Sequence, residues 1–224
     1  MDEFYQDWAE AHVEAKARRH RTMAILAERS VPCYDDILLS QTEADVLPLS
    51  EEDVVRRAIA LAAVAARDQM PDHRSYLDWI RHLDIEDAFT PKERAFVYSA
   101  APSRDDLIRF YWRYECLHVM LWALGFEAAL GMPDSPTDPE RAFGILRDRG
   151  IKGLMEHAKL RSAGELLDAT DLVFCCHSAV RDARLFSQPV PGNLDGDVVQ
   201  EWHYALNWLI GYEDDEWDDV SMDT

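Results

Sequence analysis

Two motifs in the sequence combine residue types that can bind a metal or act as a nucleophile. Glu115-x-x-His118 has the spacing found in carboxylate-bridged di-metal bundles, which also require a second Glu-x-x-His and two further glutamates. The chain has no second copy of this motif. We therefore expect His118 to be a buried histidine that hydrogen-bonds a carbonyl group, and we expect no metal site and no cofactor.

Cys175-Cys176-His177 is the second motif, and it places two thiols next to a general base. Neighbouring residues on a helix point about 100° apart, so no two of the three share a face, and the motif does not predict a catalytic thiol. The four cysteines of the chain form no C-x-x-C pair and no disulfide framework. This pattern favours reduced thiols in a cytoplasmic protein.

His177 and Arg181 are four residues apart, so they share one face of a helix. If the last helix packs against that face, Trp202 and Trp208 would join them in a pocket suited to an anionic or aromatic ligand. The alternative is structural, with Arg181 pairing with carboxylates near the C-terminus. The sequence leaves both interpretations open.

Helical periodicity runs through almost the whole chain, and capping residues mark where the helices begin. Ser50, Thr90, Ser103 and Ser162 each precede a helical pattern, and Glu follows Thr90 at the capping-box position. The expected helices cover about 3–28, 51–69, 76–83, a segment from 91, 104–131, a short segment from 139, 163–186 and 197–210. Gly211 is placed to end the last of them.

The absence of alternating strand patterns, internal repeats and long linkers predicts one all-α domain over residues 1–224, an irregular helical bundle. Within it we expect four regions. They are an N-terminal helix (1–30), an irregular connection (31–49), a helical core (50–210) and an acidic C-terminal clasp (211–224).

The segment of about 104–130 is expected to be the central helix, because it is apolar on nearly every face from residue 110 onward. Its charges argue against a membrane span. Arg113 and Glu115 point to different sides, so each needs a partner on another helix. The candidates for this polar network or ligand site are Arg113, Glu115, His177, Arg181, Asp182, His203, Asn207, Trp208, Trp217, Asp218 and Asp223.

The formal net charge of −20 is the most unusual property of the composition. It argues against binding to nucleic acids or anionic membranes, which requires Lys and Arg to neutralise phosphates. No Lys or Arg follows Arg184, and ten acidic residues lie between Asp195 and the C-terminus. We expect cations elsewhere in the fold to balance them, and the arginines at 18, 19 and 21 are one candidate group.

The last 14 residues, "GYEDDEWDDVSMDT", include seven acidic residues. The stretch lacks the central Gly and terminal Glu of an EF-hand loop, so it does not predict a specific calcium site. We expect Trp217 to pack on the core, with Asp218 and Asp223 facing arginines such as Arg113 or Arg181. An ordered clasp is the prediction, in place of a disordered acidic tail.

Four segments in order, "WRYECLHVMLWALG", "HSAVRDA", "EWHYALNWL" and "WDDVSMDT", resemble a bacterial family called domain of unknown function 4272. The resemblance covers about residues 16–224. Two positions depart from the family pattern: Ser178 stands where Trp is expected and Trp202 where Arg is expected. The resemblance implies a fold and no reaction. The positions that match the pattern are Trp112, Arg113, Glu115, Trp122, Gly125, His177, Arg181, Asp182, Glu201, His203, Asn207, Trp208, Trp217, Asp218, Asp223 and Thr224.

Two functions are consistent with these patterns. The first is a non-catalytic binding module whose acidic surface recognises a basic protein partner or a small ligand. The alternative is an enzyme that uses an Arg/Glu/His cluster (Arg113, Glu115, His177, Arg181, His203) in a Trp-lined pocket between helices. Convergence of these five side chains on a solvent-connected cavity would favour the enzyme.

Overall fold

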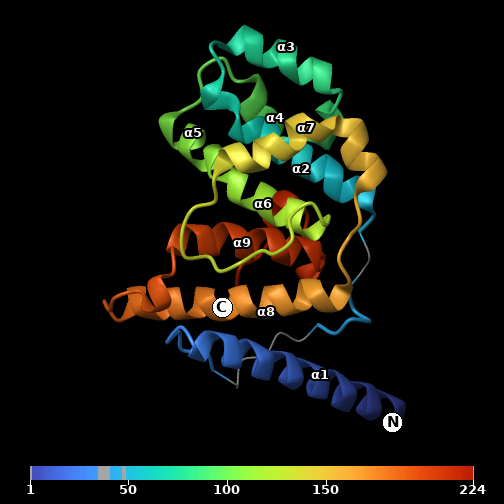
Figure 1. The fold of residues 1–224 in the computed structure, drawn as a ribbon, viewed down its shortest axis with the longest axis vertical. Helices are drawn as coiled ribbons and strands as arrows, with labels where there is room; N and C mark the ends of the chain where they lie inside the picture. Colours follow the sequence, from blue (N-terminus) through green and yellow to red (C-terminus); the bar gives the residue numbers. More distant parts are fainter. Residues whose placement is uncertain (1, 35–40, 47–48, 224) are drawn as a thin grey trace.

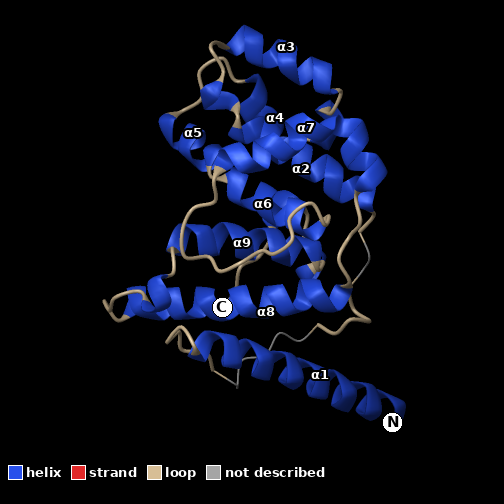
Figure 2. Ribbon diagram, in the orientation of Figure 1, coloured by secondary structure: helices blue, strands red, loops and turns tan. Residues whose placement is uncertain are grey.

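Helices account for all of the regular secondary structure in the described residues of the computed structural model, which are 2–34, 41–46 and 49–223 (Figure 2). This confirms the predicted all-α fold. The helices are α1 (Asp2–Ala27), α2 (Glu51–Ala65), α3 (His73–Leu83), α4 (Pro91–Tyr98), α5 (Arg104–Tyr111), α6 (Arg113–Ala123), α7 (Pro139–His157), α8 (Ala163–Leu185) and α9 (Gly196–Leu209). Short 3₁₀ turns cover Arg67–Gln69, Glu86–Ala88, Pro191–Asn193, Tyr212–Asp214 and Trp217–Asp219.

The predicted capping residues start the helices as expected. The side chains of Ser50 and Ser103 each accept a hydrogen bond from the backbone N–H three residues further on. At α4 the capping box is complete, because the Glu93 carboxylate also accepts from the Thr90 backbone N–H. Ser162 begins α8 with the same reciprocal pair of bonds. Each cap satisfies N–H groups that have no partner inside their own helix.

The predicted continuous helix over 104–130 is wrong in its bounds. Trp112 separates α5 from α6, and α6 ends at Ala123, two residues before Gly125, which has a φ of 77°. The Phe126 N–H donates to the Leu121 carbonyl at 2.9 Å, as in a Schellman cap. The short helix predicted from residue 139 is α7. It is longer than predicted, because it runs 19 residues from Pro139 with a break at Gly150.

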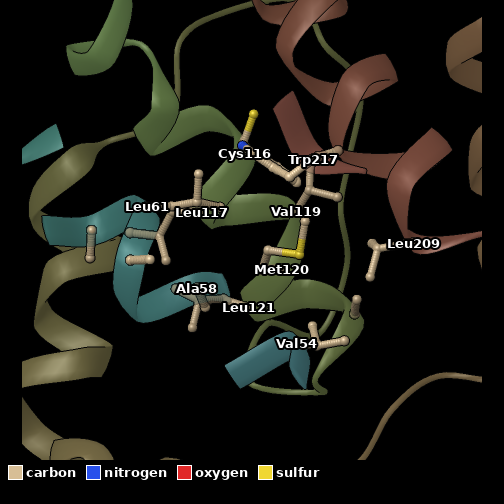
Figure 3. Packing of buried hydrophobic residues seen from close by; sticks show 14 of the residues in the cluster. Val54, Ala58, Leu61, Cys116, Leu117, Val119, Met120, Leu121, Leu209 and Trp217 are labelled. Atoms are coloured by element: carbon tan, nitrogen blue, oxygen red, sulfur yellow. The ribbon is translucent and has the colours of Figure 1, made fainter. Parts of the chain in front are cut away.

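The helices form successive layers across the molecule, in an order that differs from their order in the chain, with α6 in the middle (Figure 1). α2 packs on one side of α6 and α9 on the other, α8 lies beyond α9, and α1 lies beyond α8. Figure 3 shows Val54, Ala58 and Leu61 of α2 near Leu117 and Leu121 of α6. Every residue of α6 after Arg113 is buried, as its apolar faces predict. Among the described helices, none combines the length and apolarity needed to cross a membrane.

The arginines of α1 pair with α8 and not with the C-terminal acids, so the proposed balance of charge was wrong. Arg19 reaches Asp171 at 2.8 Å, and both side chains are 1% exposed. Arg18 and Arg21 lie 3.9 and 2.5 Å from Asp168. These contacts tie the outermost helix of the stack to its neighbour.

Candidate binding cleft beside the C-terminal segment

The C-terminal segment, residues 211–223, turns back onto the core after Gly211, whose φ of 65° ends α9. Trp217 is 4% exposed and stands edge-on to the rings of Tyr204 and Trp208, at centroid distances of 5.1 and 5.4 Å. The Tyr204 hydroxyl donates to the Trp217 carbonyl. Aromatic packing and a backbone hydrogen bond therefore hold the segment against α9.

Two cations, the buried Arg57 and the half-buried Arg113, approach the Trp217 ring from other helices. The guanidinium of Arg57 on α2 lies 4.9 Å from the ring centroid, and that of Arg113 on α6 lies 5.9 Å away. A cation at this range is attracted to the face of an indole. Trp217 thus connects α2, α6 and α9 at one point.

Two adjoining cavities, of about 450 and 630 Å³, open between the C-terminal segment and the opposite wall formed by α2 and the chain from Asp87 to Lys92. We call them together the clasp cleft. The half-buried Trp208 and the buried Arg57 line both cavities. The charged residues of the lining are Asp53, Arg56, Arg57, Asp87, Lys92, Asp214, Asp215, Glu216, Asp218 and Asp219.

The clasp cleft has an excess of negative charge, with seven carboxylates against three cations in its lining. Each of the cations is already engaged. Arg56 pairs with Asp87, and Arg57 pairs with Glu93 at 2.5 Å. Lys92 donates to the Asp218 carbonyl, and its ammonium lies 3.4 Å from Asp219. The cleft therefore presents carboxylates that its own cations do not neutralise.

The Arg57–Glu93 ion pair lies beneath the cleft, with side chains that are 5% and 2% exposed. Two further buried atoms of this pair, Arg57 Nε and Glu93 Oε1, have no hydrogen-bond partner among the described residues. Buried polar atoms almost always have a partner, so two orphans on one pair mark an unusual site. Sequence analysis missed both residues. Two features of the sequence could have indicated this ion pair. They are the two arginines inside the apolar run of α2 and the glutamate in the capping box of α4.

Arg113 has its partner on another helix, as expected, whereas Glu115 is hydrogen-bonded by a loop residue as well as by a residue of α9. Arg113 Nη1 lies 3.0 Å from Glu201 of α9. Glu115 accepts from the backbone N–H and the hydroxyl of Thr137 at 2.7 and 2.9 Å, and from the indole N–H of Trp202 at 2.9 Å. Trp202, one of the two residues that depart from the family pattern, thus donates a hydrogen bond to the buried Glu115 carboxylate.

His177 of α8 and His203 of α9 form a separate pair, with 2.7 Å between their Nδ1 atoms. Burial and the neighbouring His177 lower the pKa of His203 to about 3. Burial and the nearby Arg181 and Arg184 also lower the pKa of His177. Both rings are neutral at pH 7, with one Nδ1 donating and the other accepting.

The other predicted site residues lie on α8, on α9 and in the C-terminal segment. Arg181 is exposed and Asp182 half-buried on α8. Asn207 is buried, and its amide donates to the Ser221 carbonyl at 2.8 Å, so it holds the C-terminal segment. Asp223 is exposed.

The predicted arginine partner for Asp218 was wrong. The Asp218 carboxylate accepts from the Lys92 backbone N–H at 3.0 Å, because the first turn of α4 faces the C-terminal segment. Arg113 contacts the segment through the Trp217 ring, while its ion pair is with Glu201. The structure brings Asn207, Trp208, Trp217 and Asp218 together, and it leaves the histidines and Glu115 elsewhere.

The two motifs with metal or thiol chemistry are engaged in packing. His118 Nε2 lies 3.4 Å from the Leu130 carbonyl. A hydrogen bond with Cys33 and burial raise the pKa of Cys175, and burial raises that of Cys176 to about 12. Both thiols are therefore protonated at neutral pH, which does not suit a nucleophile. No cluster of three or more potential metal ligands occurs in the part of the chain that the structure describes.

The fold and the cleft define an all-α protein built as a stack of helices, with an acidic cleft beside its C-terminal segment. The chain belongs to the family described as Domain of unknown function (DUF4272), whose profile matches residues 18–220. This confirms the resemblance drawn from the sequence. Comparisons with the curated proteins and with the solved structures gave no match.

Proposed function

We propose that this protein is a non-catalytic binding module that recognises a basic segment of a partner protein in the clasp cleft. The observation that carries the proposal is the excess of carboxylates around Trp208, which has a half-buried ring at the wall shared by both cavities. A Lys or Arg side chain fits this environment, because carboxylates attract it and an indole face stabilises a cation.

The charge of the whole chain supports a basic partner. A net charge of −20 attracts cationic surfaces at long range and increases their rate of association. The seven carboxylates of the cleft would then fix where the partner binds. The attraction should weaken as salt screens it.

The arrangement of the polar residues counts against the enzyme alternative. Arg113 pairs with Glu201, Glu115 bonds Thr137 and Trp202, and the two histidines bond each other. Arg181 is exposed on α8. None of the five residues named for that alternative lines either cavity of the clasp cleft.

The test is calorimetric titration with a Lys/Arg-rich peptide and with a peptide in which those residues are Gln. Asp214→Asn/Glu216→Gln/Asp219→Asn removes three exposed charges from the cleft. The matched control, Asp105→Asn/Asp148→Asn/Glu156→Gln, removes three exposed charges elsewhere. We expect the cleft variant to weaken binding of the basic peptide more than tenfold, and the control about twofold or less.

Equal weakening in the two triple variants would refute the cleft as the binding site, because only the net charge would then matter. Failure of the unchanged protein to bind the basic peptide at low salt would refute the function itself. Replacing Trp208 with Leu removes the aromatic face at the shared wall. We expect this change to weaken binding without abolishing it.

A further inference from the structure

A third cavity, of about 350 Å³, lies between α2, α3 and α7 and shares no lining residue with the clasp cleft. Its floor is formed by Ile59 and Ala62 of α2. Trp79 of α3 and Phe143 of α7 contribute aromatic side chains, and leucine and isoleucine side chains make up most of the remainder. We call it the α3–α7 cavity.

The sequence accounts for this hollow in two ways. α2 places the small side chain of Ala62 beneath the cavity, where a larger residue would fill part of the space. α7 breaks at Gly150, whose φ of 64° and ψ of 170° are not helical, and Gly150 itself lines the cavity. A residue with a side chain would be strained at this φ. The wall of the cavity is thus built around two residues with little or no side chain.

Arg147 supplies the single charge of the lining. Its side chain is 69% exposed, and its nearest carboxylates are those of Glu140 and Asp148, at 3.9 and 4.0 Å. Both distances are at the outer limit of an ion pair, and exposed pairs of this kind contribute little. The guanidinium can therefore turn to a carboxylate at the mouth of the cavity at small cost.

We propose that the α3–α7 cavity binds a small apolar acid, with its hydrocarbon part against Trp79 and Leu83 and its carboxylate on Arg147. The volume is within the range of small-molecule sites. It corresponds to a chain of roughly ten carbons, since a methylene group occupies about the volume of a water molecule, ~30 Å³. Apolar walls with one positive group at the edge are complementary to a molecule with one negative group at its end.

Calorimetric titration with straight-chain carboxylates of increasing length tests the apolar part of the proposal. Each added methylene should tighten binding about fourfold until the chain fills the cavity, after which the gain should stop. Octanoate should bind more tightly than 1-octanol. Equal affinities for acid and alcohol, or no saturable binding of any chain length, would overturn the proposal.

A matched pair of arginine substitutions tests the charge. Arg147→Gln should weaken octanoate binding fivefold or more and leave 1-octanol binding unchanged. Arg149→Gln is the control, because Arg149 stacks 4.8 Å from the Phe126 ring and does not line the cavity. Equal effects of the two substitutions on octanoate would overturn the assignment of the carboxylate to Arg147.

Ala62→Leu fills the floor of the cavity and tests its location. We expect this variant to weaken octanoate and 1-octanol alike. Leu83→Trp narrows the cavity from the α3 side. It provides the same test of location if Ala62→Leu fails to fold. A folded variant of either kind, with unchanged melting temperature and unchanged octanoate affinity, would place the binding elsewhere and overturn the proposal.

Discussion

The buried histidine pair between α8 and α9 predicts a loss of stability in mild acid. The pKa of His203 is lowered to about 3 in the folded protein by burial and by His177, whereas the unfolded chain has the ordinary value of about 6.5. As the pH falls below 6.5, the unfolded chain binds a proton that the folded protein excludes. The contribution of His203 to the free energy of unfolding is therefore fully present above pH 6.5 and is lost as the pH falls toward 3.

The magnitude follows from these two pKa values. Between pH 7.5 and 5.0 the free energy of unfolding should fall by about 2 kcal/mol through His203 alone. Because pH 5.0 lies well above the folded-state pKa, this figure depends almost entirely on the unfolded-state value. His177 changes stability in the same direction, since burial and the neighbouring arginines 181 and 184 lower its pKa.

Urea denaturation followed by tryptophan fluorescence at pH 7.5 and 5.0 measures this effect. His203→Asn removes the titrating ring while it keeps a hydrogen-bonding group for His177. The loss of stability on acidification should be about 2 kcal/mol larger in the unchanged protein than in the variant. Carboxylates contribute to both proteins equally and cancel in the difference. His82→Gln, which removes an exposed histidine of α3, is the control. Equal losses in the unchanged protein and in His203→Asn would refute the assignment of the effect to the buried pair.

Four further predictions concern stability. The deletion is measured by its melting temperature, and the substitutions are measured by the same denaturation assay. Trp217→Ala should lower the free energy of unfolding by about 3–5 kcal/mol, because the ring is 4% exposed and packed against two aromatic rings. Deletion of 216–224 should lower the melting temperature, and an unchanged value would contradict an ordered C-terminal segment. Asp171→Asn should cost about 3–5 kcal/mol, since it breaks a fully buried ion pair with Arg19, whereas Asp168→Asn at the exposed pair should cost ~1 kcal/mol or less. Gly125→Ala should cost about 1–3 kcal/mol, because Gly125 has a φ of 77° and an added Cβ would lie 3.2 Å from the Lys159 carbonyl; a cost close to zero would mean that the cap can relax.

Some helix ends can be predicted from local sequence patterns alone. Ser50, Thr90, Ser103 and Ser162 start helices because a hydroxyl group can satisfy N–H groups within the same turn. Gly211 ends α9 for the equally local reason that it adopts a positive φ without strain.

The end of α6 could not be predicted in this way, because the chain offers both Gly125 and Gly131. The choice depends on residues 159–161, which donate to the last carbonyl groups of the helix. The Lys159 N–H bonds the Leu124 carbonyl at 3.1 Å, and the Arg161 N–H bonds the Ala123 carbonyl at 2.9 Å. A segment more than 30 residues away therefore helps to fix where the helix stops.

Sequence patterns alone predict that this protein is all-α, where most of its helices begin, and that the charges of its central helix need partners from elsewhere in the fold. These conclusions rest on hydrogen bonds within one turn and on the cost of burying an unpaired charge. Which partners meet depends on how the helices pack. The packing pairs Arg19 with Asp171 and His177 with His203, and it places Arg57 under Trp217. The physical reason is that a charge or a ring can be satisfied by any suitable group of the chain, and the packing of the helices selects which group comes within reach.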